Sequence, residues 1–375
     1  MTAPRFDAPV AVVFGGVSAE HDVSVRSGTA IADALRAAGR RVQAVLVDLG
    51  GSWWWLPPDH ARLGRAAAAY DDPHALGAAG PFSAPVAAGI LAAADPAPVA
   101  FIALHGPGGE DGQVQGMLDL AGVAYTGSDV TASAIGMDKT VFKRLADEIG
   151  LPVVPWTRVD EARWRSEPDE VLDELAACAA AWGGERLIVK PARLGSSVGM
   201  TIAHAAVERP AALEAAFAYD PVALVERCLD HPRELEVSVV GNRPDALEAF
   251  GPGEVIPGRE FYDYAAKYLT DDARTSPVAD IPPSLAARVR ELALAAYRVA
   301  GAAGFARADF LLEGEVVYIS EINTIPGFTE ISLFPQMCAA GGLSMPALCD
   351  RIVRLAVERM AARTAPRLTP ADLPR

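Results

Sequence analysis

Two short acidic motifs in the last third of the chain carry the most specific chemistry. Arg307-Ala-Asp309 and Glu321-Ile-Asn323 each fall in a predicted strand, so alternate side chains of each motif share a face. If the two strands pair as a hairpin, one guanidinium and three oxygen-bearing side chains converge. Oxygen ligands of this type suit Mg²⁺, which usually keeps substrate phosphates in its shell. The alternative is a solvated sheet face whose charges are only structural.

A glycine- and serine-rich loop, GSSVG at residues 195–199, follows a predicted strand at residues 185–190. Its backbone N–H groups could cover phosphates, with Lys190 pointing at the same nucleotide. The loop also matches the GxSxG motif of serine hydrolases, which need an acid and then a histidine downstream of the serine. The last histidine is His231, far from the end of the chain, which disfavours a hydrolase.

Two loops in the first third of the chain also favour binding. Gly15-Gly16 ends a predicted strand, and Glu20 follows where a helix begins, so its carboxylate could pair with a substrate ammonium. The alternative is a tight turn with an acid favoured by the helix dipole. Residues 105–112 hold four glycines, His105 and two acids, which is more than a structural turn needs. We interpret this second loop as a binding loop.

An aromatic segment, FYDYAAKY at residues 261–268, contains Lys267 and Tyr268. Such a segment could form a lid that closes over a phosphate. The alternative is an aromatic anchor for an ordinary loop.

The elements that must position these motifs begin with a strand at 10–14, a helix at 22–38 and a strand at 42–47. This βαβ order is typical of an α/β domain. Residues 50–98 look less regular, and we interpret their three consecutive tryptophans as packing. Further strands are predicted at 99–104, 185–190, 223–226, 234–240, 306–312 and 316–322, and further helices at 139–149, 285–303 and 345–362.

Composition excludes several function classes. The chain has 375 residues, with 33 Lys and Arg against 48 Asp and Glu, a net charge of −15. Such an acidic chain disfavours nucleic-acid partners, and its 51% hydrophobic content excludes wholesale disorder. No apolar stretch approaches the length of a membrane span. Four cysteines without a CxxC motif and the absence of a signal-peptide pattern predict a cytoplasmic protein.

Taken together, the motifs resemble those of the D-alanine–D-alanine ligases of the ATP-grasp superfamily. The matching segments are FGGVSAEHDVS, LHGPGGEDGQVQG, YTGSDVTASAIGMDK, IVKPARLGSSVGM, ERCLDHPRELEV, FYDYAAKY, GFARADF and EINTIPGFTEISLFP. They cover nearly the whole chain in order, except residues 50–98 and the C-terminal tail. The resemblance implies an α/β and α+β ATP-grasp fold with an N-terminal Rossmann-like parallel-sheet domain. It further implies an N-terminal domain at 1–127, a central ATP-grasp subdomain at 128–229 and a C-terminal one at 230–375.

The resemblance also implies a role for each matching residue. Contacts with ATP phosphates are implied for Lys139, Lys190, Ser196 and Ser197, and with the γ-phosphate for Lys267, beside Tyr268 in the lid. The adenine pocket would be lined by Glu226, Arg227, Cys228 and Leu229, and the ribose held by Glu234. The metal ligands would be Asp309, Glu321 and Asn323. The first D-alanine would meet Glu20 and His105, the oxyanion Arg307 and Gly327, and the second D-alanine Ser332 and Leu333.

The implied reaction joins two D-alanines through an acyl phosphate, with ATP as co-substrate and two Mg²⁺ or Mn²⁺ ions, for peptidoglycan precursor synthesis. The implied protein is a cytoplasmic homodimer without nucleic-acid or membrane partners. Glu330 stands where small or polar residues are common in the family, which leaves D-serine, D-lactate or a secondary-metabolite amino acid open as the acceptor. FYDYAAKY argues against D-lactate. A non-catalytic nucleotide-binding protein is the third alternative.

The scarcity of lysine sharpens the charge argument. Only Lys139, Lys143, Lys190 and Lys267 occur among the 33 basic residues. Three of them fall in the motifs assigned to ATP, and we predict that Lys143 lies on the exposed surface of the helix at 139–149. The negative net charge would then arise from the surface of the molecule. The ATP site would be a local basic pocket, in which Mg²⁺ adds to the positive charge.

Overall fold

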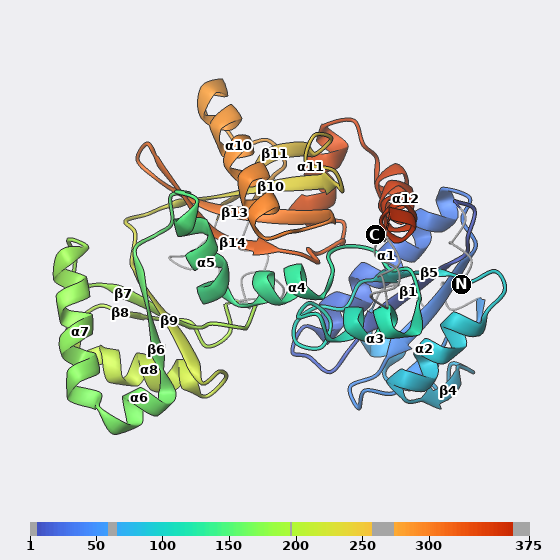
Figure 1. The fold of residues 1–375 in the computed structure, drawn as a ribbon, viewed down its shortest axis with the longest axis horizontal. Helices are drawn as coiled ribbons and strands as arrows, with labels where there is room; N and C mark the ends of the chain where they lie inside the picture. Colours follow the sequence, from blue (N-terminus) through green and yellow to red (C-terminus); the bar gives the residue numbers. More distant parts are fainter. Residues whose placement is uncertain (1–5, 59–65, 196, 257–273, 363–375) are drawn as a thin grey trace, which may run out of the picture.

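The computed structural model describes residues 6–58, 66–195, 197–256 and 274–362. Ser196, Lys267 and Tyr268 lie outside the described residues. Three sheets organise the chain, and the second and third lie next to each other on the side away from the N-terminal sheet (Figure 1). No helix in the described ranges has both the length and the apolar character needed to cross a membrane.

The first sheet has the order β4-β3-β2-β1-β5, and β1 pairs in parallel with both β2 and β5. The predicted βαβ opening is confirmed. The strands are Val10–Gly15 (β1), Val42–Val47 (β2), Trp53–Trp55 (β3), Ala79–Phe82 (β4) and Val99–Ile102 (β5), accompanied by α1 (His21–Ala37), η2 (Ala67–Tyr70), α2 (Ala84–Ala93) and α3 (Gln113–Ala121). The carboxyl ends of β1 and β5 lead into the two glycine-rich loops, as expected for a ligand crevice in a parallel sheet.

Residues 50–98 are more regular than we predicted. They contain the antiparallel strands β3 and β4, of which β4 is the edge of the sheet, and the helix α2. Trp53 and Trp54 are buried, which confirms that the tryptophan run packs. The sequence pattern did not predict these strands because β3 is very short and β4 contains Pro81. A proline is tolerated in β4 because it is an edge strand.

The second sheet, β6-β9-β7-β8, is antiparallel and carries a core of its own. Its strands are Trp156–Asp160 (β6), Leu187–Pro191 (β7), Thr201–Ala203 (β8) and Val222–Arg227 (β9), with α6 (Glu161–Ser166), α7 (Pro168–Ala181), η3 (Ala206–Glu208) and α8 (Arg209–Phe217). Two helices, α4 (Val130–Met137) and α5 (Lys139–Glu148), precede it in the chain and lead from the first sheet toward the second and third (Figure 1).

The third sheet, β12-β11-β10-β13-β14, is also antiparallel. Its strands are Arg233–Gly241 (β10), Glu248–Ile256 (β11), Arg274–Ser276 (β12), Gly304–Glu313 (β13) and Val316–Asn323 (β14), with α10 (Pro283–Val299) and α11 (Leu333–Ala340). The last helix, α12 (Met345–Ala362), returns to the first sheet and packs beside α1 (Figure 1). Each sheet falls within one predicted domain range, but α12 joins the core of the first.

Candidate active site

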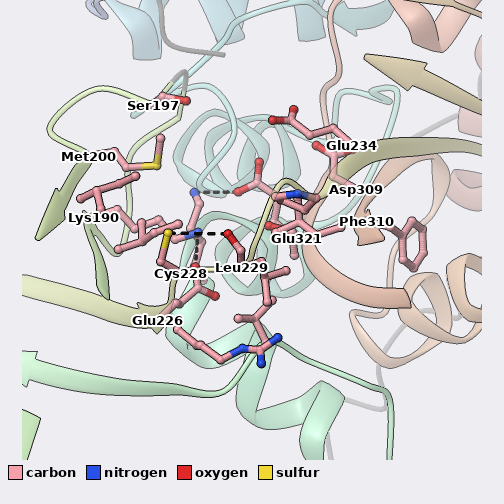
Figure 2. Close-up of a pocket in the computed structure, with 18 of the residues that line it drawn as sticks. Lys190, Ser197, Met200, Glu226, Cys228, Leu229, Glu234, Asp309, Phe310 and Glu321 are labelled. Carbon is pink, nitrogen blue, oxygen red and sulfur yellow. Dashed lines mark hydrogen bonds and ion pairs between the residues drawn. The ribbon is translucent and has the colours of Figure 1, made fainter. Parts of the chain in front are cut away.

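A cavity of about 880 Å³ lies between the second and third sheets and collects most of the predicted ATP and metal residues (Figure 2). The predicted residues that line it are Lys139, Lys190, Ser197, Glu226, Arg227, Cys228, Leu229, Glu234, Arg307, Asp309 and Glu321. Side chains from β7, β9, β10, β13 and β14 therefore meet in one pocket of a size that suits a nucleotide.

The predicted hairpin of the two acidic motifs is confirmed. β13 and β14 pair antiparallel, with Asp309 opposite Glu321 and Arg307 opposite Asn323. Arg307 donates to both carboxylate oxygens of Asp309, with each N–O distance 2.7 Å. Burial alone would lower the pKa of Arg307, but Asp309 and Glu236 outweigh it and hold that pKa well above its usual value. The guanidinium is thus held as a fixed positive charge beside the two carboxylates.

The donor set of this hairpin fits Mg²⁺. In the described part of the chain, no three His, Cys, Asp or Glu side chains are grouped for a metal. At this hairpin the candidate ligands are two carboxylates, from Asp309 and Glu321, and the amide oxygen of Asn323. Asn323 Oδ1 already accepts from the backbone N–H of Ile325 at 3.1 Å, which fixes its orientation. Few protein ligands and many remaining positions are what Mg²⁺ uses when substrate phosphates complete its shell.

Lys139 joins the hairpin to the glycine–serine loop. Its Nζ lies 3.1 Å from Glu321 Oε2 and donates to the Leu194 carbonyl at 2.9 Å. Burial would lower the pKa of Lys139, but the charge of Glu321 outweighs it and the pKa is raised. Lys139 therefore stays charged at the point where the loop begins.

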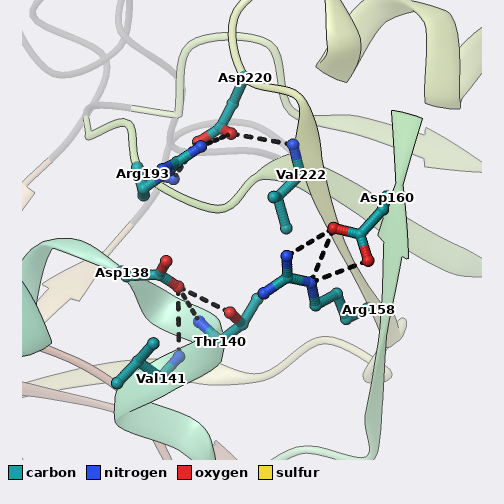
Figure 3. Close-up of polar contacts among 8 residues, drawn as sticks. All are labelled: Asp138, Thr140, Val141, Arg158, Asp160, Arg193, Asp220 and Val222. Atoms are coloured by element: carbon teal, nitrogen blue, oxygen red, sulfur yellow. Dashed lines mark hydrogen bonds and ion pairs between the residues drawn. The ribbon is translucent and has the colours of Figure 1, made fainter. Parts of the chain in front are cut away.

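Local hydrogen bonds explain why the loop and α5 sit where they do (Figure 3). Asp138 caps α5 by accepting from the backbone N–H groups of Thr140 and Val141 at 3.0 and 3.2 Å. Arg193, just before the loop, donates from its Nε to Asp220 at 3.0 Å, and Asp220 also accepts from the Val222 N–H. The start of the loop is thus tied to the start of β9. Ser197, inside the loop, has a φ of 58°, in the left-handed region.

The prediction that Lys143 is exposed is wrong. It is fully buried, and its Nζ lies 2.6 Å from Glu226 Oε1, while the other oxygen of Glu226 lies 2.5 Å from Lys190 Nζ. Burial raises the pKa of Glu226, but the two ammonium groups outweigh it and hold the pKa at about 2. Burial, with Lys190, lowers the pKa of Lys143. The carboxylate of Glu226 on β9 offsets the cost of burying the ammonium of Lys143.

The predicted D-alanine residues do not line this cavity and lie beside it, toward the first sheet. Glu20 lies at the start of α1, and a Cβ built on Gly195 would lie 3.2 Å from its Oε2, so Glu20 faces the loop. His105 Nε2 lies 3.1 Å from Ser27 Oγ. That hydroxyl oxygen also accepts from the Phe328 N–H at 3.2 Å, next to Gly327.

The predicted second-substrate segment is close to Gly327. A Cβ on Gly327 would meet Ser332 Oγ at 2.8 Å, and that hydroxyl oxygen accepts from the Thr329 N–H at 3.1 Å. The side chain of Leu333 is buried in a small apolar cluster with Met337. Only the backbone of Leu333 is therefore left for a substrate contact.

Glu236 and Lys143 are two of the polar residues at the site that were missed from the sequence. Glu236 lines the cavity opposite Asp309, with its Oε2 3.2 Å from Arg307 Nε. It lies two residues after Glu234 on β10, so alternation along the strand was a usable signal. Lys143 lies four residues after Lys139 on α5, and this spacing places two residues on one helix face.

Comparison with known proteins identifies the family. The models described as the D-ala D-ala ligase N-terminus and C-terminus match residues 9–128 and 145–354. The chain is 40% identical over 369 residues to the D-alanine–D-alanine ligase of Chlorobium phaeovibrioides, covering 93% of this chain and 97% of that one. It is 39% identical over 360 residues to that of Heliobacterium modesticaldum, covering 93% and 94%.

Solved structures agree. The D-alanine-D-alanine ligase from Coxiella burnetii superposes with a TM-score of 0.77 at 30% identity, covering 95% of this chain and 96% of that one. The VanG D-Ala:D-Ser ligase from Enterococcus faecalis superposes with a TM-score of 0.76 at 26% identity, covering 93% and 99%. The fold is therefore the ATP-grasp fold expected from the sequence, and this chain belongs to the D-alanine–D-alanine ligase family.

Proposed function

We propose that this protein joins two D-alanines to D-alanyl-D-alanine at the expense of ATP, in the synthesis of peptidoglycan precursors. The observation that carries the proposal is the convergence of Lys139, Lys190 and Arg307 with the oxygen set of Asp309 and Glu321 in one nucleotide-sized cavity. Family membership supports the same activity.

The first task of the site is to bring a carboxylate toward a triphosphate of the same sign. Lys139 and Lys190 supply fixed positive charge for the phosphates, and Glu20 would hold the ammonium of the first D-alanine. A Mg²⁺ ion held by Asp309, Glu321 and Asn323 would neutralise further phosphate charge. Much of the rate enhancement then comes from positioning, as in other phosphoryl transfers.

The chemistry follows in two steps. A carboxylate oxygen of the first D-alanine attacks the γ-phosphorus, forming an acyl phosphate and releasing ADP. The deprotonated amine of the second D-alanine, held near Ser332 and the backbone of Leu333, then attacks the acyl carbon. Arg307 and the Gly327 N–H would stabilise the oxyanion before phosphate leaves with the bridging oxygen. Ser197, with Ser196, Lys267 and Tyr268 from outside the described residues, would exclude water from the acyl phosphate.

The nucleotide would lie along the rest of the cavity. We propose that the segment from Glu226 to Leu229 contacts adenine and that Glu234 accepts from the ribose hydroxyls, because all of these residues line the cavity. His105 would help to hold the first D-alanine, since Ser27 and the Phe328 N–H link it to the segment that contains Gly327.

Several finer features are also proposals. We propose two Mg²⁺ or Mn²⁺ ions, a homodimer, and domain boundaries at 127/128 and 229/230. We further propose a cytoplasmic location, which is supported by four cysteines that form no disulfide. Equilibrium sedimentation would test the dimer, and limited proteolysis would test the boundaries.

The test of the activity uses purified protein, ATP, Mg²⁺ and a panel of D-amino acids that includes D-serine, together with the hydroxy acid D-lactate. D-Serine belongs in the panel because one structural neighbour is a D-Ala:D-Ser ligase. We expect phosphate release that depends on D-alanine, with D-alanyl-D-alanine as the main product by mass spectrometry. A preferred mixed product would move the assignment to another acceptor, and no amino-acid-dependent phosphate release would leave a non-catalytic nucleotide-binding protein.

A further inference from the structure

Lys143 is a fully buried charge that does not itself line the cavity. Its Nζ contacts Glu226 Oε1 at 2.6 Å from behind, while Lys190, which does line the cavity, contacts the other oxygen of Glu226 at 2.5 Å. Removing an ammonium from water is costly, and an apolar side chain would fill the same space between α5 and β9 without that cost. The placement of Lys143 therefore requires an electrostatic reason.

The contact between Lys143 and Glu226 is an ion pair between two buried groups, and hydrogen bonding is the smaller part of it. Coulomb attraction, which is strong in the protein interior, is therefore the main effect of Lys143 on Glu226. The pKa of Glu226 is held at about 2, so burial does not remove its negative charge near neutral pH.

The formal charges show what Lys143 changes. Glu226 and Lys190 alone would form a neutral pair, because the carboxylate of Glu226 would neutralise the positive charge of Lys190. With Lys143 on the second oxygen, the three residues keep one positive charge at the wall where Lys190 faces the cavity. A net positive charge at that wall favours a polyphosphate.

We propose that Lys143 is a positioning residue for nucleotide binding, which holds one oxygen of Glu226 so that Lys190 keeps its positive charge for the phosphates of ATP. This inference rests on the proposed function only in naming ATP as the ligand of the cavity. It concerns a lysine that never touches the nucleotide and acts through Glu226 and Lys190.

The test compares two variants on the same helix. Lys143→Met removes the buried charge, and Arg144→Met removes a neighbouring exposed charge as the matched control. ADP affinity is measured by calorimetry in the presence of Mg²⁺, and the melting temperature of each variant is recorded. We expect Lys143→Met to weaken ADP binding about tenfold or more, and Arg144→Met to change it by less than about twofold.

A double variant separates charge from packing. Lys143→Met leaves Glu226 and Lys190 as a neutral pair, whereas Lys143→Met/Glu226→Gln again leaves one positive charge. Because Glu226 also lies in the segment proposed to contact adenine, Glu226→Gln alone is measured as the reference. We expect Lys143→Met to weaken ADP binding by about threefold or less in the Glu226→Gln background, against about tenfold or more in the unmodified protein. In steady-state kinetics, Lys143→Met should raise the KM for ATP and leave the KM for D-alanine within about twofold.

Two results would overturn the inference. One is ADP affinity in Lys143→Met equal to that of the unmodified protein, whatever the melting temperature. The other is a loss of ADP affinity on Lys143→Met that is equal in the unmodified protein and in the Glu226→Gln background. If Lys143→Met does not unfold cooperatively, Lys143→Gln is measured in its place against the same double variant. ADP binding needs no amino acid. If the protein did not turn over D-alanine, the proposed function would be wrong, but the ADP affinities of the variants could still be compared.

Discussion

Two clusters of charge adjoin the same cavity, and their formal charges have opposite signs (Figure 2). The phosphate-side cluster consists of Lys143, Glu226 and Lys190, with two positive charges against one negative. The metal-side cluster consists of Lys139, Glu236, Arg307, Asp309 and Glu321, with two positive charges against three negative. One wall thus suits the polyphosphate, and the other needs an added cation.

This difference corrects the view of the site as a single basic pocket in an acidic protein. The net charge of −15 says nothing about either wall, because each wall is set by a few buried contacts. A magnesium–ATP complex carries both signs and would match both walls at once. Weakening each wall separately should therefore have different consequences.

The largest effect is expected from the metal-side cluster. Glu321→Gln removes a proposed metal ligand and the partner of Lys139, so D-alanine-dependent phosphate release should fall about 100-fold or more, since even outer partners of metal ligands matter about 10–100-fold. Phosphate release over a range of Mg²⁺ concentrations measures this. Glu315→Gln, at the exposed turn of the same hairpin, is the control. Retained turnover in Glu321→Gln would refute the metal assignment.

The next effect is expected at the phosphate-side cluster. Lys190→Met should lower kcat/KM for ATP about 10- to 100-fold, the range expected for a lost hydrogen bond to a charged group. The KM for D-alanine should change little, because Glu20 and His105 do not line the cavity. Initial rates with one substrate varied at a time provide the comparison. An unchanged KM for ATP would mean that Lys190 does not serve the nucleotide.

A smaller effect is expected outside both clusters. Glu20→Gln should lower kcat/KM for D-alanine roughly tenfold through the loss of one charged contact, and leave ADP affinity unchanged. Calorimetry with ADP and initial rates with D-alanine test the two halves of this expectation. If ADP binding fell together with D-alanine use, the separation between the ammonium site and the charged walls would not hold.

The smallest effect is on stability against acid. The folded pKa of Glu226, about 2, lies below its ordinary value of 4.5, so its ionised form stabilises the fold above pH 4.5 and this contribution is lost as pH falls toward 2. Relative to Lys143→Met/Glu226→Gln, the unmodified protein should lose on the order of 1 kcal/mol between pH 6 and pH 4. Thermal unfolding at both pH values measures this. A constant difference would contradict the charge assignment.

The metal side was predictable from the sequence, whereas the phosphate side was only partly so. Asp309 and Glu321 sit in short motifs within apolar strands, and alternation along a hairpin is enough to bring them together. Lys143 lies on a helix where the apolar Val141 is partly exposed and the lysine is buried, the reverse of the usual pattern. Its partner, Glu226, lies on a strand distant in the sequence, and neither helix nor strand periodicity predicts a contact between the two.

The fold likewise contains one part that was predictable from the sequence and one that was not. The βαβ opening was predictable because β1 is a continuous buried apolar run, as parallel strands are. The return of α12 to the first sheet was not, because a helix's apolar face does not say which sheet will cover it.

The fate of one oxygen atom tests the central claim, ligation through an acyl phosphate, most directly. D-Alanine labelled with ¹⁸O in its carboxylate is turned over with ATP and Mg²⁺, and the released phosphate is analysed by mass spectrometry. Ligation through an acyl phosphate predicts one labelled oxygen in each phosphate released, because the attacking carboxylate oxygen leaves with phosphorus when the peptide bond forms. Unlabelled phosphate, formed at the same rate as D-alanyl-D-alanine, would contradict it.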